Sequence, residues 1–238
     1  MIRSNAVKIL IDHHPEPNLA QFDLCYSEVK TSSTSELVFG VIEGLGGSKI
    51  IDRNIAECIY VGIMTDTGSF SYACNSSRTF NIIAKLLETG MNAEQVHRLV
   101  YDNYSEERLR LLGFSLSEKL KVIKELASAY IALDMSELKR FSYKEGDTEG
   151  LVNYALSIDG IKVAVLLTER KNKIRLSFRS KGNFPVNEIA RDHFEGGGHL
   201  NAAGGDSYLP MDATIQKLES LLLLYKDRIG QSSYPKTI

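Results

Sequence analysis

Hydrophobic residues along this chain follow two periods, and each period predicts a different kind of element. The alternation at residues 173–180 places Ile174, Leu176 and Phe178 on one face and charged or hydroxyl side chains on the other, as in a half-buried β-strand. Elsewhere apolar residues recur every three or four positions, which predicts amphipathic helices. We expect helices at residues 33–46, 52–59, 76–89, 92–100, 105–126, 146–158, 185–194 and 212–226, and strands at residues 7–11, 60–66, 127–134, 161–169 and 172–180.

Polar side chains mark the ends of several of these elements. Ser33 stands three residues before Glu36, which is the spacing of a helix capping box. The predicted strand at residues 7–11 runs into Asp12 and two histidines, and the predicted strand at residues 60–66 ends in an acid. In a parallel α/β sheet such strand ends form sites, because they meet at the same edge of the sheet.

The order of the predicted elements divides the chain into two parts. In the first part strands alternate with helices, which is the pattern of a parallel α/β sheet, whereas in the second part strands follow one another more closely. We therefore expect an α/β protein of two domains joined by a long helix. The first domain is expected over residues 1–100, the linker helix over residues 101–126 and the second domain over residues 127–238.

Composition narrows the class of protein without naming an activity. With 238 residues, 43% hydrophobic content, 24% charged residues and a net charge of −2, the chain reads as a globular protein whose bulk charge demands neither nucleic acid nor a membrane surface. Its three cysteines are widely spaced and form no CxxC pair, which argues against a disulfide framework or a zinc knuckle. No apolar run approaches the roughly 20 residues of a membrane span. We expect a cytoplasmic protein.

Asp12, His13 and Asp66 are the first candidates for chemistry, because they follow two strands that a parallel sheet would bring together. Carboxylate oxygen and imidazole nitrogen together suit Mn²⁺, Fe²⁺ or Zn²⁺. Three groups are too few for a complete site, and paired histidines at a strand end also serve as turn features or in hydrogen-bond networks. His97 and His193 lie in predicted helices with apolar neighbours, where we interpret them as packed or surface histidines.

A second candidate region combines a basic strand with a run of glycines. Arg175, Ser177 and Arg179 share one face of their strand, and guanidinium groups offer a planar fork of donors to phosphate. About 20 residues later the triplet at residues 196–198 precedes His199; such glycines let backbone N–H groups close on an anion at a helix start. The alternatives are a solvated strand face and a tight turn between helix and strand. Together the two features favour a phosphate site.

Four ordered motifs give the chain a family resemblance. DHH at residues 12–14, TDTGSF at 65–70, FRS at 178–180 and GGGHLNAAG at 196–204 resemble the DHH phosphoesterase superfamily, in the subgroup with a C-terminal DHHA1 domain. EGLVNYALSI at residues 149–158 is similar to the oligoribonuclease and 3′-phosphoadenosine 5′-phosphate phosphatase branch. The resemblance implies a parallel-sheet DHH domain, a DHHA1 α/β domain with a mixed sheet, and hydrolysis of short RNA or of that nucleotide with two Mn²⁺ ions.

The resemblance also implies roles for individual residues. His13 and Asp66 would ligate one ion, His14 would lie beside the scissile phosphate, and Asp12 would orient the neighbouring histidine. The phosphate or terminal nucleotide would be held from the DHHA1 side by a further set of residues. These are Arg179, Ser180, Gly197, Gly198 and His199.

The chain departs from the family at its start. In the family two further ligand motifs, including a bridging aspartate, precede DHH by tens of residues, whereas only eleven residues precede Asp12 here. We therefore expect the N-terminal part of the DHH domain to be missing, the metal site to be incomplete, and exposed strand edges that allow a homodimer. Two hypotheses remain: an enzyme whose N-terminal segment lies outside this chain, and a nucleotide-binding remnant without catalysis. Polyphosphate and cyclic dinucleotides are the alternative substrates.

Overall fold

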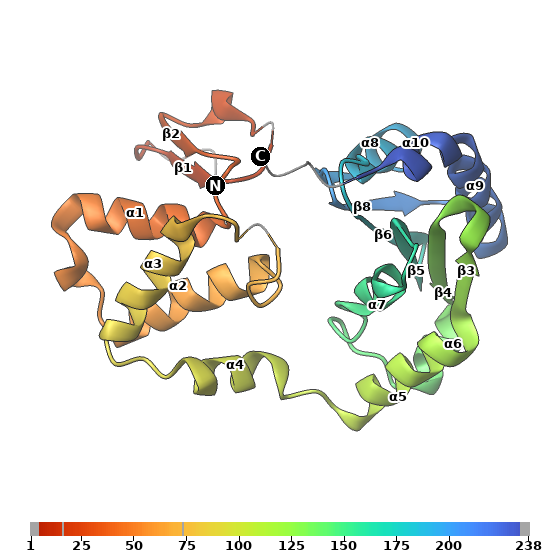
Figure 1. The fold of residues 1–238 in the computed structure, drawn as a ribbon, viewed down its shortest axis with the longest axis horizontal. Coiled ribbons are helices and arrows are strands. Elements are labelled where there is room, and N and C mark those ends of the chain that lie inside the picture. Colours follow the sequence, from red (N-terminus) through yellow and green to blue (C-terminus); the bar gives the residue numbers. More distant parts are fainter. Residues whose placement is uncertain (1–4, 16, 73, 234–238) are drawn as a thin grey trace. The chain divides into compact units, whose positions relative to one another are not determined.

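The computed structural model describes residues 5–15, 17–72 and 74–233, and the chain divides into two compact units, Met1–Asn103 and Tyr104–Ile238 (Figure 1). The N-terminal unit contains β1 (Ile9–Asp12), β2 (Leu24–Ser27), α1 (Thr34–Gly46), α2 (Arg53–Asp66), α3 (Ser77–Glu88) and α4 (Ala93–Tyr101). The C-terminal unit contains α5 (Glu106–Phe114), β3 (Leu120–Ile123), β4 (Ser128–Leu133), α6 (Met135–Arg140), α7 (Leu151–Ser157), β5 (Val163–Arg170), β6 (Lys173–Ser180), α8 (Val186–His193), β7 (Gly197–His199), β8 (Ala202–Ser207), α9 (Met211–Leu224) and α10 (Lys226–Gln231). None of the helices within the described ranges is long and apolar enough to cross a lipid bilayer.

The N-terminal unit is a helical cluster beside a small parallel sheet. Strands β1 and β2 pair in parallel, with Ile9 opposite Leu24 and Asp12 opposite Ser27. Helices α1 to α4 enclose the core of this unit, with α2 in contact with each of the other three, and Phe39 of α1 is almost fully buried there. The parallel pairing agrees with the α/β pattern expected for this part, but its second strand, β2, was not among the expected strands.

The segment predicted as a strand at residues 60–66 is helical instead, which corrects the sequence-based expectation. Helix α2 runs without a break from Arg53 to Asp66, and the side chain of Asp52 caps it by accepting a hydrogen bond from the backbone N–H of Ile55 at 2.9 Å. Its buried side chains recur at helical spacing; they are Ala56, Ile59, Tyr60, Ile63 and Met64. A short apolar run is ambiguous between strand and helix when it is read alone. Asp66 therefore ends a helix rather than a strand.

The C-terminal unit is built on one mixed sheet of six strands with helices on both faces. The strand order is β3-β4-β5-β6-β8-β7, and β4 and β5 are parallel while the other neighbouring pairs are antiparallel. Side chains from α8, α9 and α10 complete the core on one face, and side chains from α5, α6 and α7 complete the core on the other. Ile174, Leu176 and Phe178 all point into the first of these cores, as the alternation predicts. The expected mixed-sheet domain is confirmed.

The long linker helix expected over residues 101–126 is replaced by several short elements. Helix α5 ends at Phe114, a π-helical turn spans Ser115–Lys119, and strand β3 follows directly. β-branched side chains occupy part of β3, and the strand pairs with β4 in antiparallel register from Leu120 opposite Ile131. Pairing with a sheet edge therefore outweighs the helical period of this segment, because ladder hydrogen bonds form only in the tertiary structure.

Candidate active site

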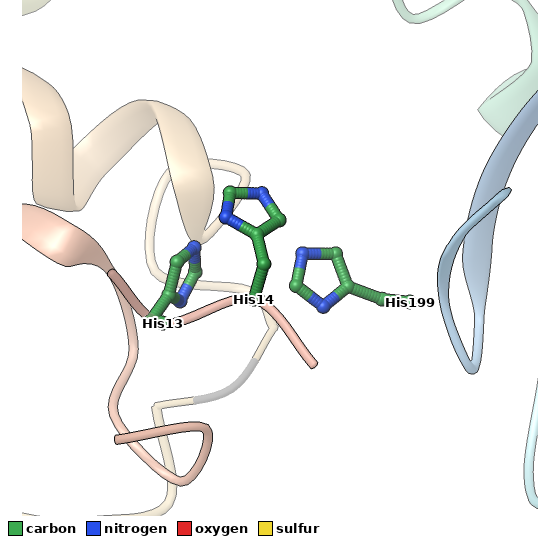
Figure 2. Close-up of side chains that lie close together, drawn as sticks. All are labelled: His13, His14 and His199. Atoms are coloured by element: carbon green, nitrogen blue, oxygen red, sulfur yellow. The ribbon is translucent and has the colours of Figure 1, made fainter. Parts of the chain in front are cut away.

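The end of β1 presents an acid and two imidazoles that are ordered by hydrogen bonds. Asp12 Oδ1 accepts a hydrogen bond from the backbone N–H of His14 at 3.2 Å and lies 2.7 Å from His14 Nδ1. Partial burial raises the pKa of the Asp12 carboxyl, but these bonds from His14 outweigh it and hold that pKa below its usual value. The rings of His13 and His14 meet edge to face, with centroids 4.8 Å apart. Figure 2 shows both rings where the chain leaves β1, and the ring of His199 on its own strand.

His13 and Asp66 come together although they are far apart in the sequence. His13 Nε2 lies 3.5 Å from Asp66 Oδ2, and the His13 side chain is 11% exposed whereas the Asp66 side chain is 45% exposed. The carboxyl end of β1 thus faces the carboxyl end of α2. The pair combines one nitrogen and one oxygen donor in a site that solvent can reach from the Asp66 side.

A left-handed turn follows Asp66 and ends helix α2. Gly68, Ser69 and Phe70 have φ angles of +54°, +57° and +64°, a region that glycine adopts easily and other residues do not. Thr67 anchors the turn from inside: its side chain is fully buried, and its hydroxyl donates to Ile63 O at 2.7 Å and accepts from the backbone N–H of Phe70 at 3.0 Å. The backbone beyond Asp66 is therefore fixed in an uncommon conformation.

A buried carboxylate joins the starts of α1 and α3 in the same unit. Glu36 is 2% exposed, and its carboxylate accepts hydrogen bonds from the hydroxyls of Ser32 at 2.6 Å and Thr79 at 2.9 Å. Arg78 Nε lies 3.2 Å from the same carboxylate. Only half of the predicted capping box forms: Ser33 Oγ accepts from the Glu36 N–H at 3.2 Å, but the Glu36 carboxylate turns toward α3. The capping spacing indicated Glu36, yet its long-range partners are not visible in the sequence.

The predicted residues of β6 differ in exposure and in partners. Arg179 is half-buried and its guanidinium donates to Phe178 O at 2.9 Å. Ser180 is buried, and its hydroxyl donates to Phe184 O at 2.7 Å and accepts from the Asn201 amide at 2.8 Å. Ser180 therefore fixes the turn that follows β6, while Arg179 retains an accessible face. The neighbouring Arg175 is occupied differently, because its guanidinium pairs with a carboxylate on β8.

That carboxylate belongs to Asp206, which lies 3.1 Å from Arg175 Nη1 and 2.6 Å from Lys173 Nζ. Burial raises the pKa of the Asp206 carboxyl, but the hydrogen bonds from Lys173 and Arg175 outweigh it and hold that pKa below its ordinary value of 3.8. Two of the cations on this strand face are thus neutralised within the protein.

The glycine triplet forms an edge strand and a hairpin, and it does not start a helix. Gly197–His199 make up β7, which pairs with β8 in antiparallel register, with His199 opposite Ala202. Gly198 has a φ of +142°, and a Cβ at this position would lie 2.6 Å from Ala202 O, so the close backbone approach requires glycine. Helix α8 precedes this edge strand, so the interpretation as a tight turn between helix and strand describes the backbone better.

His97, interpreted from the sequence as a packed or surface histidine, contacts the turn that follows Asp66. His97, on α4, lies with Nε2 3.2 Å from Ser69 Oγ in the left-handed turn. His193, by contrast, contacts the hydroxyl of Tyr225 at 3.1 Å within the helices of the C-terminal unit, which agrees with its interpretation as a packed histidine. No local sequence signal distinguishes the two, because both occupy amphipathic helices.

Comparison with known proteins finds a family model for each unit. Residues 1–63 match the model of the DHH family, N-terminal domain, and residues 123–230 match the model of the DHHA1 domain. The probable bifunctional oligoribonuclease and PAP phosphatase NrnA of Streptococcus mutans is 31% identical over 217 residues, which are 90% of this chain and 67% of that protein. The bifunctional oligoribonuclease and PAP phosphatase NrnA of Bacillus subtilis is 29% identical over 92% of this chain and 69% of that protein.

A solved structure agrees with these matches. The crystal structure of an exopolyphosphatase-related protein from Bacteroides fragilis superposes with a TM-score of 0.92 at 43% identity, over 97% of this chain and 67% of that chain. This chain thus spans about two thirds of the length of these relatives. The relatives from Streptococcus mutans and Bacillus subtilis are each named as both an oligoribonuclease and a phosphatase. Both activities hydrolyse phosphoester bonds, so the expected enzyme class is confirmed at the level of the family. The chain therefore belongs to the DHH family and carries a DHHA1 domain in its C-terminal unit.

Proposed function

We propose that this protein is a metal-dependent phosphoesterase that hydrolyses short oligoribonucleotides and 3′-phosphoadenosine 5′-phosphate. The observation that carries the proposal is the contact of 3.5 Å between His13 Nε2 and Asp66 Oδ2, which joins two of the motifs at one solvent-accessible point. The names of the relatives from Streptococcus mutans and Bacillus subtilis support the two substrates. Manganese is the ion that we propose.

The donor pair fits a divalent transition-metal ion. Imidazole nitrogen and carboxylate oxygen are both common ligands of such ions. Two atoms that bind one ion at bond lengths of about 2.0–2.2 Å can lie no more than about 4.4 Å apart, and the observed 3.5 Å falls within that limit. A complete site needs further ligands or water, so we expect this chain to bind the ion weakly. When bound, the ion supplies Lewis acidity toward water and phosphate oxygens.

The protein's own residues would position the substrate around this pair. His14 Nδ1 is bonded to Asp12, which orients the ring so that Nε2 is directed away from the carboxylate. Because the His14 side chain is 58% exposed, that nitrogen can reach a bound substrate, where it would donate a hydrogen bond to a phosphate oxygen when the ring is protonated. Asp12 stays ionised near neutral pH, since its pKa is lowered, and it accepts the Nδ1–H of His14. In the neutral ring this leaves Nε2 as an acceptor, and both nitrogens donate only in the imidazolium form.

The C-terminal unit would hold the remote phosphate or nucleotide. Arg179 would supply a charge-assisted donor, and Gly197, Gly198 and His199 would offer backbone and imidazole groups on the edge strand. Because the hydroxyl of Ser180 is already occupied on both sides, we assign Ser180 to shaping the turn beside Arg179. A grip on one end of the substrate suits a chain of a few nucleotides better than a long polymer.

The proposal is tested by incubating the purified chain with 3′-phosphoadenosine 5′-phosphate and with end-labelled RNA of two to five nucleotides, with and without Mn²⁺. We expect Mn²⁺-dependent release of phosphate and of mononucleotides, which chelation stops and Asp66→Asn abolishes. Asp102→Asn is the matched control, since Asp102 is another exposed aspartate at a helix end of the same unit. Nucleotide binding without any Mn²⁺-dependent hydrolysis would instead favour the non-catalytic hypothesis.

Arg179→Ala tests the binding side separately. Because a hydrogen bond to a charged group contributes about 1.5–3 kcal/mol, loss of the guanidinium should weaken the affinity for 3′-phosphoadenosine 5′-phosphate about 10- to 150-fold. Unchanged affinity in an equilibrium binding assay would refute the role of Arg179.

Polyphosphate remains a second candidate substrate, favoured by the likeness to the exopolyphosphatase-related protein from Bacteroides fragilis. Against it, the cations of Lys173 and Arg175 are engaged by Asp206, which leaves fewer positive charges for a polyanion. Release of phosphate from polyphosphate in the same assay, without cleavage of RNA, would select this alternative.

A further inference from the structure

The left-handed turn after Asp66 contains two non-glycine residues in an unfavourable backbone conformation. Ser69 and Phe70 have φ angles of +57° and +64°, a region in which a side chain with a Cβ strains the backbone. Strain of this kind persists only where other contacts hold it. Because the turn directly follows Asp66 of the candidate site, the contacts that hold the turn bear on the position of Asp66.

The Asp66 carboxylate itself has little direct support. Within the part of the chain that the structure describes, the contact with His13 at 3.5 Å is the one polar contact found for it, and almost half of the side chain is exposed. Its direction therefore depends on the backbone to which it is attached. That backbone is the last turn of α2, which passes through Thr67 into the left-handed turn.

Several contacts hold this turn, among them the backbone hydrogen bond from the Ser69 N–H to Met64 O at 2.8 Å and two side-chain hydrogen bonds that differ in origin. Thr67 acts from within the segment, through its buried hydroxyl bonded to the Phe70 N–H. His97 acts from another element: its Nε2 lies 3.2 Å from Ser69 Oγ, and its ring packs on Tyr101 of the same helix with centroids 4.9 Å apart. Helix α4, which carries His97, packs against α2. The hydrogen bond therefore ties the strained turn to a neighbouring helix.

We infer that His97 and Ser69 form a positioning pair, which holds the left-handed turn and thereby keeps the Asp66 carboxylate opposite His13. This inference rests on the proposed function, in which Asp66 and His13 bind the metal ion. His97 would not touch the substrate or the ion. It would act through Ser69 and the backbone of residues 66–70 alone.

The inference predicts that breaking the bond disturbs His13, which lies on a different element. We would label the five histidines isotopically and record the imidazole signals without metal. His97→Leu and Ser69→Ala should both shift the His13 signal, and the double variant should shift it no further than either one. His97→Gln, which keeps a donor near Nε2, should restore most of the wild-type signal. Ser69→Ala removes one oxygen atom only, so it keeps the test valid if His97→Leu fails to fold.

The matched control is His193→Leu, which breaks the comparable bond between a helical imidazole and the Tyr225 hydroxyl at 3.1 Å. It lies in the other compact unit and should leave the His13 signal unchanged. If the His13 signal is unchanged in both His97→Leu and Ser69→Ala, the positioning role is wrong, whatever the activity of the chain.

A Mn²⁺ titration separates this inference from the proposed function. Paramagnetic broadening of the His13 signal reports binding even when it is weak, and loss of a residue that orients a metal ligand typically costs about 10-fold or more in metal affinity. We expect His97→Leu and Ser69→Ala to need about 10-fold more Mn²⁺ for the same broadening, and His97→Gln to stay near wild type. Broadening that is equal in Asp66→Asn and wild type would overturn the proposed metal site, whereas loss in Asp66→Asn with no change in His97→Leu would overturn only the positioning pair.

Discussion

Replacing Glu36 should loosen the N-terminal unit far more than replacing another glutamate on the same helix. Glu36 and Glu43 both lie on α1, and both pair with a cation on α3: Arg78 for the first and Lys85 for the second. They differ in burial, because the Glu36 side chain is 3% exposed and the Glu43 side chain is 42% exposed. The comparison therefore isolates the stability that burial adds to an otherwise similar ion pair between α1 and α3.

The expected magnitude follows from the partners that each variant leaves behind. Glu36→Ala removes the acceptor of two side-chain hydroxyls, those of Ser32 and Thr79, and each such loss costs about 1–1.5 kcal/mol of folding free energy. The pair with Arg78 adds at most about 1 kcal/mol, because half of that arginine is exposed and its charge is rehydrated. The total is about 3 kcal/mol, and Glu36→Gln, which keeps one acceptor, should cost about half of that. Glu43→Gln should cost less than about 1 kcal/mol, as exposed pairs do.

Hydrogen exchange followed by mass spectrometry measures this separately for the two units. A loss of about 3 kcal/mol raises the exchange rate of peptides from α1 and α3 by about 150-fold when exchange is limited by unfolding of the unit. Peptides from β5 and β6 in the C-terminal unit are the internal reference and should not change. Equal effects of Glu36→Ala and Glu43→Gln would refute the reasoning, because the buried hydroxyl bonds would then contribute nothing.

The C-terminal unit allows two further predictions. The pKa of Asp206 is lowered in the folded protein, so its pairs with Lys173 and Arg175 stabilise the fold above about pH 4, and this contribution is lost as the pH falls through the lowered pKa. The difference in melting temperature between wild type and Asp206→Asn should therefore be largest near pH 7 and shrink below about pH 4. A difference that grows on acidification would contradict this reasoning. Gly198→Ala should destabilise the β7–β8 hairpin by about 1–3 kcal/mol, because its Cβ would meet the β8 backbone, whereas Gly197→Ala, whose Cβ meets nothing within 4 Å, should leave the melting temperature unchanged.

Sequence pattern alone predicted the elements whose period is unambiguous. The alternation of residues 173–180 gave β6 with the expected buried face, since a period of two fits no helix. Helix starts were also predictable: Ser33, Asp52 and Asn92 each accept a hydrogen bond from a backbone N–H in the first turn of their helix. Both signals are local, so they survive without knowledge of the tertiary structure.

Two of the mistaken elements are segments in which local and tertiary preferences differ. The run before Asp66 contains β-prone residues, but its buried side chains face three helices at once, which a helix can satisfy. The segment after Phe114 shows the reverse, because it leaves the helix through a π-turn to pair with the edge of the sheet at β4. In both cases the deciding contacts come from residues far away in the chain.

Sequence motifs indicated the residues of the candidate site but not its geometry. Motifs indicated His13 and Asp66, and a parallel sheet was expected to bring them together through two strand ends. The observed contact instead joins a strand end to a helix end. The sequence also offered no reason to include His97. Its contact with Ser69 depends on how α4 packs against α2 and on a left-handed turn that the sequence pattern did not predict.

The residues singled out from the sequence fall into two groups that differ in the exposure of their side chains. Asp66 and His14 keep large parts of their side chains in solvent, so an ion or a substrate can reach them. Ser180 and Glu36 are buried, and each has its polar atoms occupied by neighbours. A ligand cannot reach a buried, saturated group without first breaking those bonds, which costs more than one new contact returns. Substitution of the second group should therefore lower stability before it alters affinity, although a motif read from sequence gives both groups equal weight.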